Sequence, residues 1–241
     1  MNIIKLNAIS STNDYLKELN AATPAENFTT VVAEYQTAGK GQMGAKWNVE
    51  PGKNLTFSVL IKDVLPDVAG IFNLNVAVAV SVVQALNSLA LQEINIKWPN
   101  DILAGSKKIG GILIENAIKP DGSIQSVIGI GLNVNQTDFN GLPKASSLAI
   151  VSDKTFDKEQ IMMAILNALR ANVEFVNNNA QQLLDTYHSL LFKKNIPATF
   201  EKDGSRFVGI IQGVSASGNL IILHENDKVA EYGLKEIALL Y

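Results

Sequence analysis

Gly39-Lys40-Gly41-Gln42-Met43-Gly44 follows a predicted strand, and its three glycines have the G-x-G-x-x-G spacing of a dinucleotide-binding turn. Asp63 lies about 20 residues further on, where such folds carry an acid that binds ribose. Residues 45–54 nevertheless exclude that fold, because they include Pro51 and Gly52 and cannot form the crossover helix. The segment also lacks the Gly-Lys-Ser/Thr ending of a P-loop. The pattern therefore argues against a doubly wound parallel sheet.

The same loop can bind an anion in another way. Glycines let backbone N–H groups approach a ligand closely, and Lys40, Lys46 and Lys53 against Glu50 make the segment basic. A long loop of this kind can close over a phosphate-bearing ligand. The alternative interpretation is a flexible connection with solvated lysines, which the loop taken alone favours equally.

Outward from the loop, the patterns of apolar residues predict a mixture of strands and helices. Predicted strands span residues 29–35, 55–62, 93–98, 108–119 and 124–135, with a turn at Pro120-Asp121-Gly122-Ser123. Predicted helices span residues 10–20, a long segment opened by Pro66-Asp67, a segment from Asp157 past Val173, and residues 180–191.

The pattern changes near Asn195-Ile196-Pro197. Beyond this point, short apolar runs alternate with turn residues, which predicts a small all-β module of about five strands. We therefore expect two domains, residues 1–194 and residues 195–241.

Composition excludes several classes of protein. Hydrophobic residues make up 47% of the 241-residue chain, so a sizeable core can form. A net charge of −3 argues against generic binding to nucleic acid, and the absence of Cys excludes disulfides and thiolate nucleophiles. The N-terminus shows no signal peptide, and we expect a cytoplasmic protein.

The uncharged segment from Val68 to Gln92 has the length of a membrane span. Its polar residues, however, fall on one side of a helical wheel: Asn73, Ser81, Gln84, Asn87 and Ser88. We expect a mostly buried helix, and no association with a membrane.

Five segments follow one another between residues 10 and 135: Ser11-Thr12-Asn13; residues 34–47; Lys97-Trp98-Pro99-Asn100-Asp101-Ile102; residues 108–115; and residues 129–135. In this order and spacing they resemble the biotin protein ligase family. Five motifs in register make a chance match very improbable. The resemblance implies an α+β fold, in which a mixed β-sheet catalytic domain of the class II synthetase-like biotin/lipoate ligase type precedes a small SH3-like β-barrel.

The resemblance implies a site for biotin. Its residues would be Ser11, Thr12, Asn13, Gln36, Lys40, Gly41, Gln42, Lys108 and Gly131. The biotin ureido ring has one carbonyl acceptor and two N–H donors, so small hydroxyl and amide side chains suit it. Ser11 can serve as a helix cap as well, and Gln36 can be merely a polar residue at a strand end.

The resemblance also implies a site for ATP, formed by Lys40, Trp47, Asn100, Asp101, Lys108 and Asn133. Trp47 would stack near adenine, although it could equally anchor the loop. Asn100 and Asp101 would lie near the phosphates or the acceptor lysine, whereas in isolation they indicate an ordinary turn.

Lys108 is the predicted catalytic residue. It would bridge the biotin carboxylate and the α-phosphate of ATP and so offset their charge repulsion. Its neighbour Lys107 is expected to be a solvated surface charge. The glycines at 129 and 131 would bring backbone groups to the ligand, or else indicate tight strand packing.

The chain departs from the family's commonest pattern in two places. The usual loop of the family is Gly-Arg-Gly-Arg. Here Lys40 keeps the positive charge but lacks the guanidinium that can form two parallel hydrogen bonds to a phosphate, and Gln42 is uncharged. We therefore expect the adenylate to be held less tightly. Family members often end the last strand with an arginine that reaches ATP, but residues 236–240 contain none, so we expect a supporting role for the C-terminal module.

The implied reaction has two steps. Biotin attacks Mg-ATP to give biotinyl-5′-AMP and pyrophosphate, and a lysine of a biotin carboxyl carrier protein then displaces AMP. Mg²⁺ is expected to arrive with ATP. No protein metal site is expected, because His188 and His224 have no partners at metal-ligand spacing. A homodimer is compatible with the sequence.

Two alternatives remain open, and a third is not expected. A lipoate or octanoate ligase has a related fold, although the segment from Lys97 to Asp101 favours biotin. A non-catalytic biotin-binding sensor would keep Ser11 and Gln36 but would not need Lys108. A DNA-binding repressor would need about 60 residues for an N-terminal helix-turn-helix domain. The first motif, Ser11-Thr12-Asn13, lies close to Met1, so we expect neither that domain nor DNA binding.

Overall fold

The computed structural model describes residues 1–65 and 67–241. The first seven strands are β1 (Ile3–Ile9), β2 (Thr30–Gln36), β3 (Leu55–Lys62), β4 (Ile94–Lys97), β5 (Asp101–Ala104), β6 (Lys107–Ile118) and β7 (Ile124–Leu132). The helices are α1 (Thr12–Ala22), α2 (Ile71–Ser88), α3 (Leu148–Ser152), α4 (Lys158–Asn178) and α5 (Ala180–Ser189), with 3-10 turns at Gln42–Gly44 and Val68–Gly70. The last five strands are β8 (Pro197–Lys202), β9 (Ser205–Val214), β10 (Leu220–His224), β11 (Val229–Tyr232) and β12 (Ala238–Leu240).

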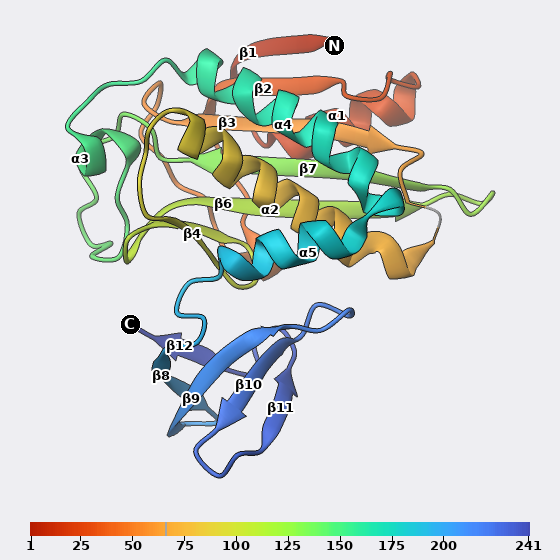
Figure 1. Cartoon of the computed structure of the whole chain (residues 1–241). Coiled ribbons are helices and arrows are strands. Elements are labelled where there is room, and N and C mark those ends of the chain that lie inside the picture. The colour runs from red at the N-terminus through yellow and green to blue at the C-terminus, as the bar shows by residue number, and fades with distance from the viewer. Residues whose placement is uncertain (66) are drawn as a thin grey trace.

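The strands form two separate sheets (Figure 1). The large sheet has the order β1-β2-β3-β7-β6-β5-β4, and the small sheet has the order β11-β10-β9-β8-β12. β1 runs parallel to β2, whereas the other neighbours in the large sheet are antiparallel. The predicted α+β fold with a mixed sheet and a small all-β module is confirmed.

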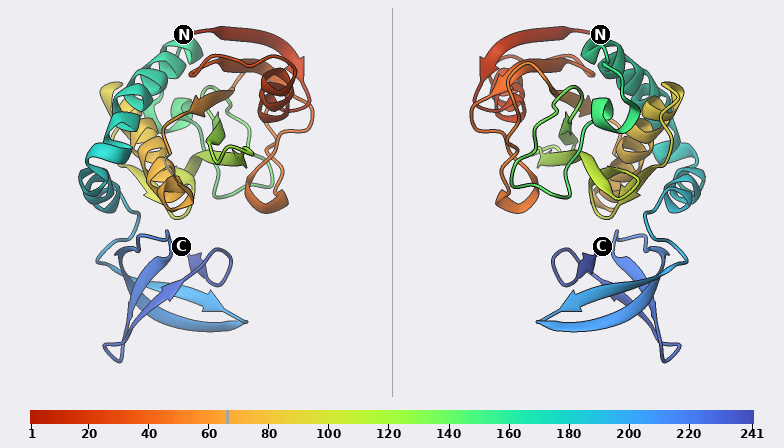
Figure 2. Two further views of the ribbon diagram at one scale, coloured as in Figure 1. Left: turned by 90° about the vertical axis from the view of Figure 1, so that its right-hand side faces the viewer. Right: turned by 90° about the vertical axis from the view of Figure 1, so that its left-hand side faces the viewer.

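Helices cover both faces of the large sheet (Figure 2). Along β3, Phe57 and Val59 belong to the cluster that packs against α2 and α4, while Leu60 points the other way, onto Leu16 of α1. Successive side chains of a strand point to opposite faces of the sheet. A strand with apolar residues at both odd and even positions must therefore be covered on both faces. This arrangement places the N-terminus of α1 beside the end of β2 at Gln36, and against Glu115 of β6 and Gly129 of β7.

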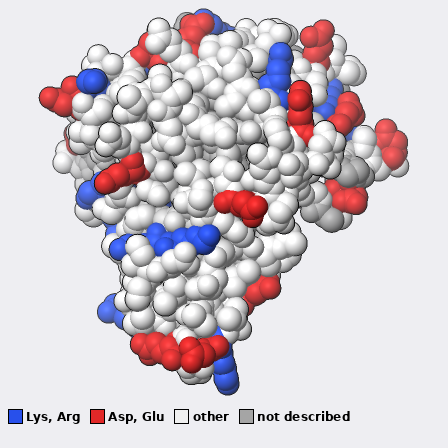
Figure 3. All heavy atoms as spheres, viewed as in Figure 1, with Lys and Arg blue, Asp and Glu red and all other residues white. Residues whose placement is uncertain are grey.

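Helix α2 is long and apolar enough to cross a membrane, but 61% of it is buried within the molecule. The polar side of the predicted helical wheel faces α4, where the Asn172 amide donates to Ser81 Oγ at 2.9 Å and to Gln84 Oε1 at 2.8 Å. The prediction of a buried core helix is confirmed. The face formed by α2, α4 and α5 carries charges of both signs among many uncharged residues (Figure 3).

Two strands and one helix were not predicted. β1 pairs with β2 in parallel, a contact that local pattern does not reveal. β5 begins at Asp101, directly after the turn at residues 98–100, and lies between β4 and β6. Helix α3 is too short for a periodic signal. The predicted opening of the long helix at Pro66 lies outside the described residues, and the α-helix itself begins at Ile71.

The small sheet packs against the rest of the molecule. Trp98 Nε1 donates to the carbonyl of Gly218 at 2.9 Å, and the Val214 N–H donates to His188 Nε2 at 3.0 Å. Phe200 and Ile211 of the small sheet belong to the same apolar cluster as α2. The domain boundary at residue 194 remains a prediction.

Candidate active site

A cavity of about 240 Å³ lies on the α1 side of the large sheet, between α1, the ends of β2, β6 and β7, and the glycine-rich loop. With one exception, Asn133, every residue predicted for the site lines it: Ser11, Thr12, Asn13, Gln36, Lys40, Gly41, Gln42, Trp47, Asn100, Asp101, Lys108 and Gly131. Residues that are far apart in the sequence thus meet at one place. Ser11 and Gly131, for example, are 120 residues apart.

The start of α1 orients the first polar groups of the cavity. Ser11 caps the helix, with its Oγ accepting from the Asp14 N–H at 3.3 Å, which leaves the Ser11 O–H as a donor. The backbone N–H and the hydroxyl of Thr12 donate to Gln36 Oε1 at 2.7 and 3.0 Å. Because Gln36 Oε1 is engaged in this way, its Nε2 is the group that can donate to a ligand.

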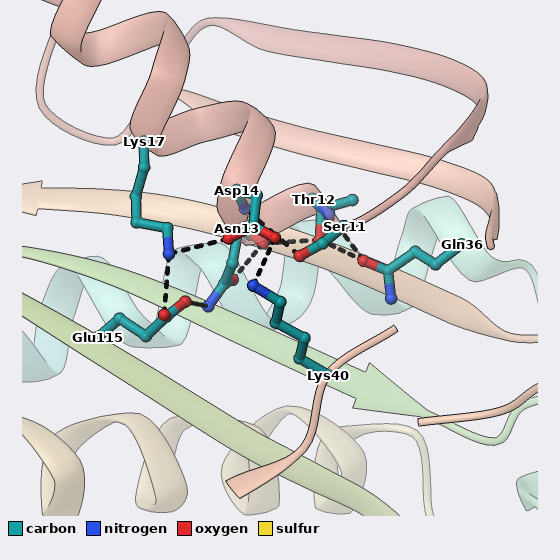
Figure 4. A network of polar contacts seen from close by, with 9 residues as sticks. Ser11, Thr12, Asn13, Asp14, Lys17, Gln36, Lys40 and Glu115 are labelled. Atoms are coloured by element: carbon teal, nitrogen blue, oxygen red, sulfur yellow. Dashed lines mark hydrogen bonds and ion pairs between the residues drawn. The ribbon is translucent and has the colours of Figure 1, made fainter. Parts of the chain in front are cut away.

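Two residues that were not predicted hold Asn13 in place: Glu115, labelled in Figure 4, and Ser58. The amide nitrogen of Asn13 donates to Glu115 at 2.7 Å, and its Oδ1 lies 2.6 Å from the buried hydroxyl of Ser58. A side chain on Gly129 would meet Asn13 Oδ1 at 2.5 Å, so the glycine makes room for this amide. One signal for Ser58 was available: it is a polar residue within an apolar strand. Glu115 gave no local signal.

A chain of ion pairs continues from Glu115. Lys17 Nζ lies 2.8 Å from Glu115 and 2.9 Å from Asp14, and Asp14 also binds Lys40 of the loop at 2.6 Å. Partial burial raises the pKa of the Asp14 carboxyl, but hydrogen bonds from Lys40 and Lys17 outweigh it and hold that pKa below its usual value. For Lys17, burial lowers the pKa of the ammonium. Its bonds to Glu115 and Asp14 outweigh this effect, so the pKa is raised overall. Asp14 and Lys17 are therefore charged at neutral pH.

The glycine-rich loop forms a small hairpin over the cavity. The Gly41 N–H donates to the carbonyl of Ala45 at 2.7 Å, and the Trp47 N–H donates to that of Gly39 at 2.9 Å. The Trp47 indole lies on Gly131, where a Cβ would come within 2.5 Å of the ring. Its buried Nε1 has no hydrogen-bond partner among the described residues. Trp47 thus anchors the loop, and it brings an unused donor to the cavity.

Lys108, near the start of β6, lines the cavity as well. Its Nζ is 2.5 Å from Asp101 Oδ1 and 5.8 Å from the centre of a Trp47 ring, with 36% of its side chain exposed. Asp101 Oδ2 also lies 3.4 Å from Lys97 Nζ. Asn100 donates its amide to the carbonyl of Ile112 at 2.8 Å, so this residue supports the wall of the cavity.

Asn133 is turned away from the cavity. Its Nδ2 donates to the carbonyl of Ser146 at 2.9 Å and its backbone N–H to that of Ile109 at 2.7 Å. The side chain of Asn133 thus joins β7 to the segment before α3. Its predicted contact with ATP stays a prediction. The neighbouring Lys107 is exposed and donates to the carbonyl of Pro143, as expected of a surface charge.

The small module contributes Tyr241, which was not predicted, to an adjoining cavity of about 430 Å³. The Tyr241 ring lies 4.2 Å below Lys144 Nζ and 5.7 Å from Lys97 Nζ, and it packs edge-on against Phe192. Burial, followed by the charge of Asp101, raises the pKa of the Tyr241 hydroxyl. Gln42 lines this cavity as well as the first, so the two adjoin.

Residues 6–135 match the model of the biotin/lipoate A/B protein ligase family. The chain is 38% identical over 168 residues to the bifunctional ligase/repressor BirA of Bacillus spizizenii, which aligns 68% of this chain with 51% of that protein. It is 30% identical over 216 residues to the biotin–[acetyl-CoA-carboxylase] ligase of Mycobacterium tuberculosis, covering 88% of this chain and 79% of that one. The chain spans about half the length of the first curated relatives that it matches.

The fold has counterparts among solved structures. The biotin protein ligase of Aquifex aeolicus, solved in complex with biotin and ATP, superimposes with a TM-score of 0.82 at 26% identity. The superposition covers 99% of this chain and 98% of that one, so it includes both sheets.

Proposed function

Because the chain belongs to the biotin/lipoate A/B protein ligase family, we propose that it activates biotin with ATP and transfers the biotinyl group to a lysine of a biotin carboxyl carrier protein. The observation that supports this most strongly is the convergence of the five family segments on one cavity lined by Lys40 and Lys108. Such a cavity suits a reaction between two anions, a carboxylate and a phosphate.

The polar groups near α1 match the ureido ring of biotin. The O–H of Ser11 and the Nε2 of Gln36 are donors that the protein leaves available for a carbonyl. The Ser58–Thr12 and Ser58–Asn13 contacts, at 2.7 and 2.6 Å, orient the hydroxyl and amide beside them. In the proposal, biotin therefore lies with its ring at α1 and its carboxylate toward the two lysines.

Lys108 is proposed to act on the reacting groups. Its ammonium would neutralise charge as the carboxylate attacks the α-phosphate, and Asp101 at 2.5 Å orients it. Lys40 and the loop would bind the phosphate side of the adenylate, and Trp47 would cover the ligand. The orphaned Nε1 of Trp47 is a further donor for a ligand in this cavity.

Mg²⁺ is proposed to enter as part of the Mg-ATP substrate. Across residues 1–65 and 67–241, three or more His, Cys, Asp or Glu side chains are nowhere grouped as metal ligands. Asp101, the acid at the cavity, is already paired with Lys108 and Lys97. In the second step the acceptor amine attacks the mixed anhydride and AMP leaves. A cytoplasmic location, where carrier proteins and ATP occur together, is part of the proposal.

The test is biotin-dependent release of pyrophosphate from Mg-ATP, with lipoate and octanoate in parallel. We expect release with biotin alone, and formation of a stable amide when a biotin carboxyl carrier protein is added. Release with lipoate or octanoate instead would replace the substrate while keeping the reaction. Binding of biotin without release would indicate a sensor and would contradict the role of Lys108.

A further inference from the structure

Asp14 connects the glycine-rich loop to helix α1, although it is not among the residues that line the cavity. It occupies the first turn of α1, directly after Ser11, Thr12 and Asn13. Its Oδ2 lies 2.6 Å from Lys40 Nζ, and its Oδ1 lies 2.9 Å from Lys17 Nζ (Figure 4). One carboxylate thus bonds both to the loop and, through Lys17, to Glu115 of β6.

The loop otherwise bonds mainly to itself. Its hairpin is closed by the backbone bonds between Gly41 and Ala45 and between Gly39 and Trp47, which set Lys40 opposite Lys46. Trp47 fixes the end of the loop on Gly131. The Lys40–Asp14 pair fixes its beginning on α1, so each arm of the hairpin has one side-chain contact outside the loop.

An unpaired lysine at position 40 would occupy many rotamers, and a ligand would have to order it on binding. A lysine already paired with a carboxylate has lost that freedom before the ligand arrives, which is preorganisation. The Lys40 ammonium has three N–H donors, and Asp14 uses one of them. The remaining donors can bind an anionic ligand while the pair persists.

We propose that Asp14 is a positioning residue: its carboxylate holds the Lys40 ammonium, and with it residues 39–47, over the cavity before an anionic ligand enters. The inference rests on the proposed ligase function for its consequence, a longer-lived adenylate. Its structural part, loop closure in the free protein, can be measured without any ligand.

The first experiment compares loop closure in Asp14→Asn and the wild type by the rate of tryptic cleavage after Lys46, without ligand. Cleavage of this kind follows the population of the open loop. We expect cleavage to be faster by about fivefold, the upper range for one partly exposed ion pair. The matched control is Glu159→Gln, which breaks the exposed Lys5–Glu159 pair of 2.7 Å away from the loop and should leave the rate unchanged.

A second variant separates the two partners of Asp14. Lys17→Met removes the arm to Glu115 and keeps the Lys40 pair, so its cleavage rate should stay near that of the wild type. An equal increase in Lys17→Met and Asp14→Asn would show that Asp14 acts through α1 and β6, and would overturn the proposal. An unchanged rate in Asp14→Asn would do the same.

The consequence for the ligand is tested by a double-mutant cycle on the dissociation rate of biotinyl-5′-AMP. Asp14→Asn should raise the rate by about fivefold in the wild type and leave it unchanged in a Lys40→Gln background. Equal effects in both backgrounds would contradict the pairing with Lys40. If biotin releases no pyrophosphate yet cleavage after Lys46 still rises, the ligase function fails while the role of Asp14 in loop closure stands.

Discussion

Lys108 and Lys107 are adjacent lysines with different surroundings. Lys108 lines the cavity and pairs with Asp101, whereas Lys107 points outward onto the carbonyl of Pro143. Strand alternation explains the difference, because successive side chains point to opposite faces. The pair therefore provides a matched comparison for the proposed chemistry.

We predict that Lys108→Ala lowers the rate of biotin-dependent pyrophosphate release by roughly 10²–10³-fold, the loss typical of a group that stabilises transition-state charge. Biotin should still bind, because Ser11 and Gln36 remain. Lys107→Ala should release pyrophosphate at the wild-type rate. Calorimetric titration with biotin and a pyrophosphate assay on both variants check this, and full activity in Lys108→Ala would refute it.

Gln42 lines the cavity at the loop position where the related family pattern has a second arginine. An uncharged amide cannot pair with a phosphate as a guanidinium does. We predict that Gln42→Arg slows the dissociation of biotinyl-5′-AMP by about tenfold, the effect of one charge-assisted hydrogen bond. The measurement is the release rate of the preformed adenylate, and an unchanged rate would sink the prediction.

At the scale of elements, β7 and β6 each place a glycine next to Trp47 of the loop, but at different distances from its ring. A Cβ on Gly131 would lie 2.5 Å from the Trp47 ring, whereas a Cβ on Gly111 would lie 3.7 Å from it, at ordinary contact distance. Trp47 can therefore lie flat on β7 only because residue 131 has no side chain.

We predict that Gly131→Ala displaces Trp47 and weakens binding of ATP by about tenfold or more, since roughly 1.4 kcal/mol of lost contact suffices. Gly111→Ala is the comparison on the neighbouring strand: its Cβ would meet Trp47 and the end of the Lys108 side chain only at ordinary contact distance, so it should weaken ATP binding less than Gly131→Ala does. Tryptophan fluorescence and ATP titration report both effects. Equal behaviour of the two variants would mean that Trp47 does not need this glycine.

At the scale of the whole molecule, His188 of α5 joins the small module to the rest of the chain by accepting the Val214 N–H. Burial, and then the charge of Lys194, hold the pKa of the His188 imidazole below its usual value, with Asp185 acting in the opposite direction. Only the neutral ring can accept this bond at Nε2. The folded chain therefore favours neutral His188.

The unfolded chain binds a proton at His188 near pH 6.5, before the folded chain does. The contribution of His188 to stability is thus full above about pH 6.5 and is lost as pH falls toward the lower folded-state pKa. We predict that His188→Gln, which can still accept the bond, loses less stability than the wild type between pH 7.5 and 5.5, by about 1 kcal/mol. Urea denaturation at both pH values measures this, and equal losses would contradict it.

The sequence alone determined the elements with strong local signals. Leu55–Lys62 is a strand at the predicted residues, and Ser11 and Asp157 cap α1 and α4 as their spacing predicts. The residues that line the cavity had no comparable local signal and were expected only from the resemblance of the five segments to a known family. Capping, alternation and turn chemistry act over a few residues, so they can be read along the chain.

Tertiary structure decided the remainder. β1 and β5 exist as strands through their pairing with β2, β4 and β6, and such pairing leaves no signal in a short segment of the chain. Asp14 lies within the predicted helix of residues 10–20, but its pairing with Lys40 depends on where a loop 26 residues away folds back. Asn133, predicted at ATP, is turned onto Ser146. Long-range pairing and side-chain direction depend on which surfaces are buried together, and only the folded chain settles that.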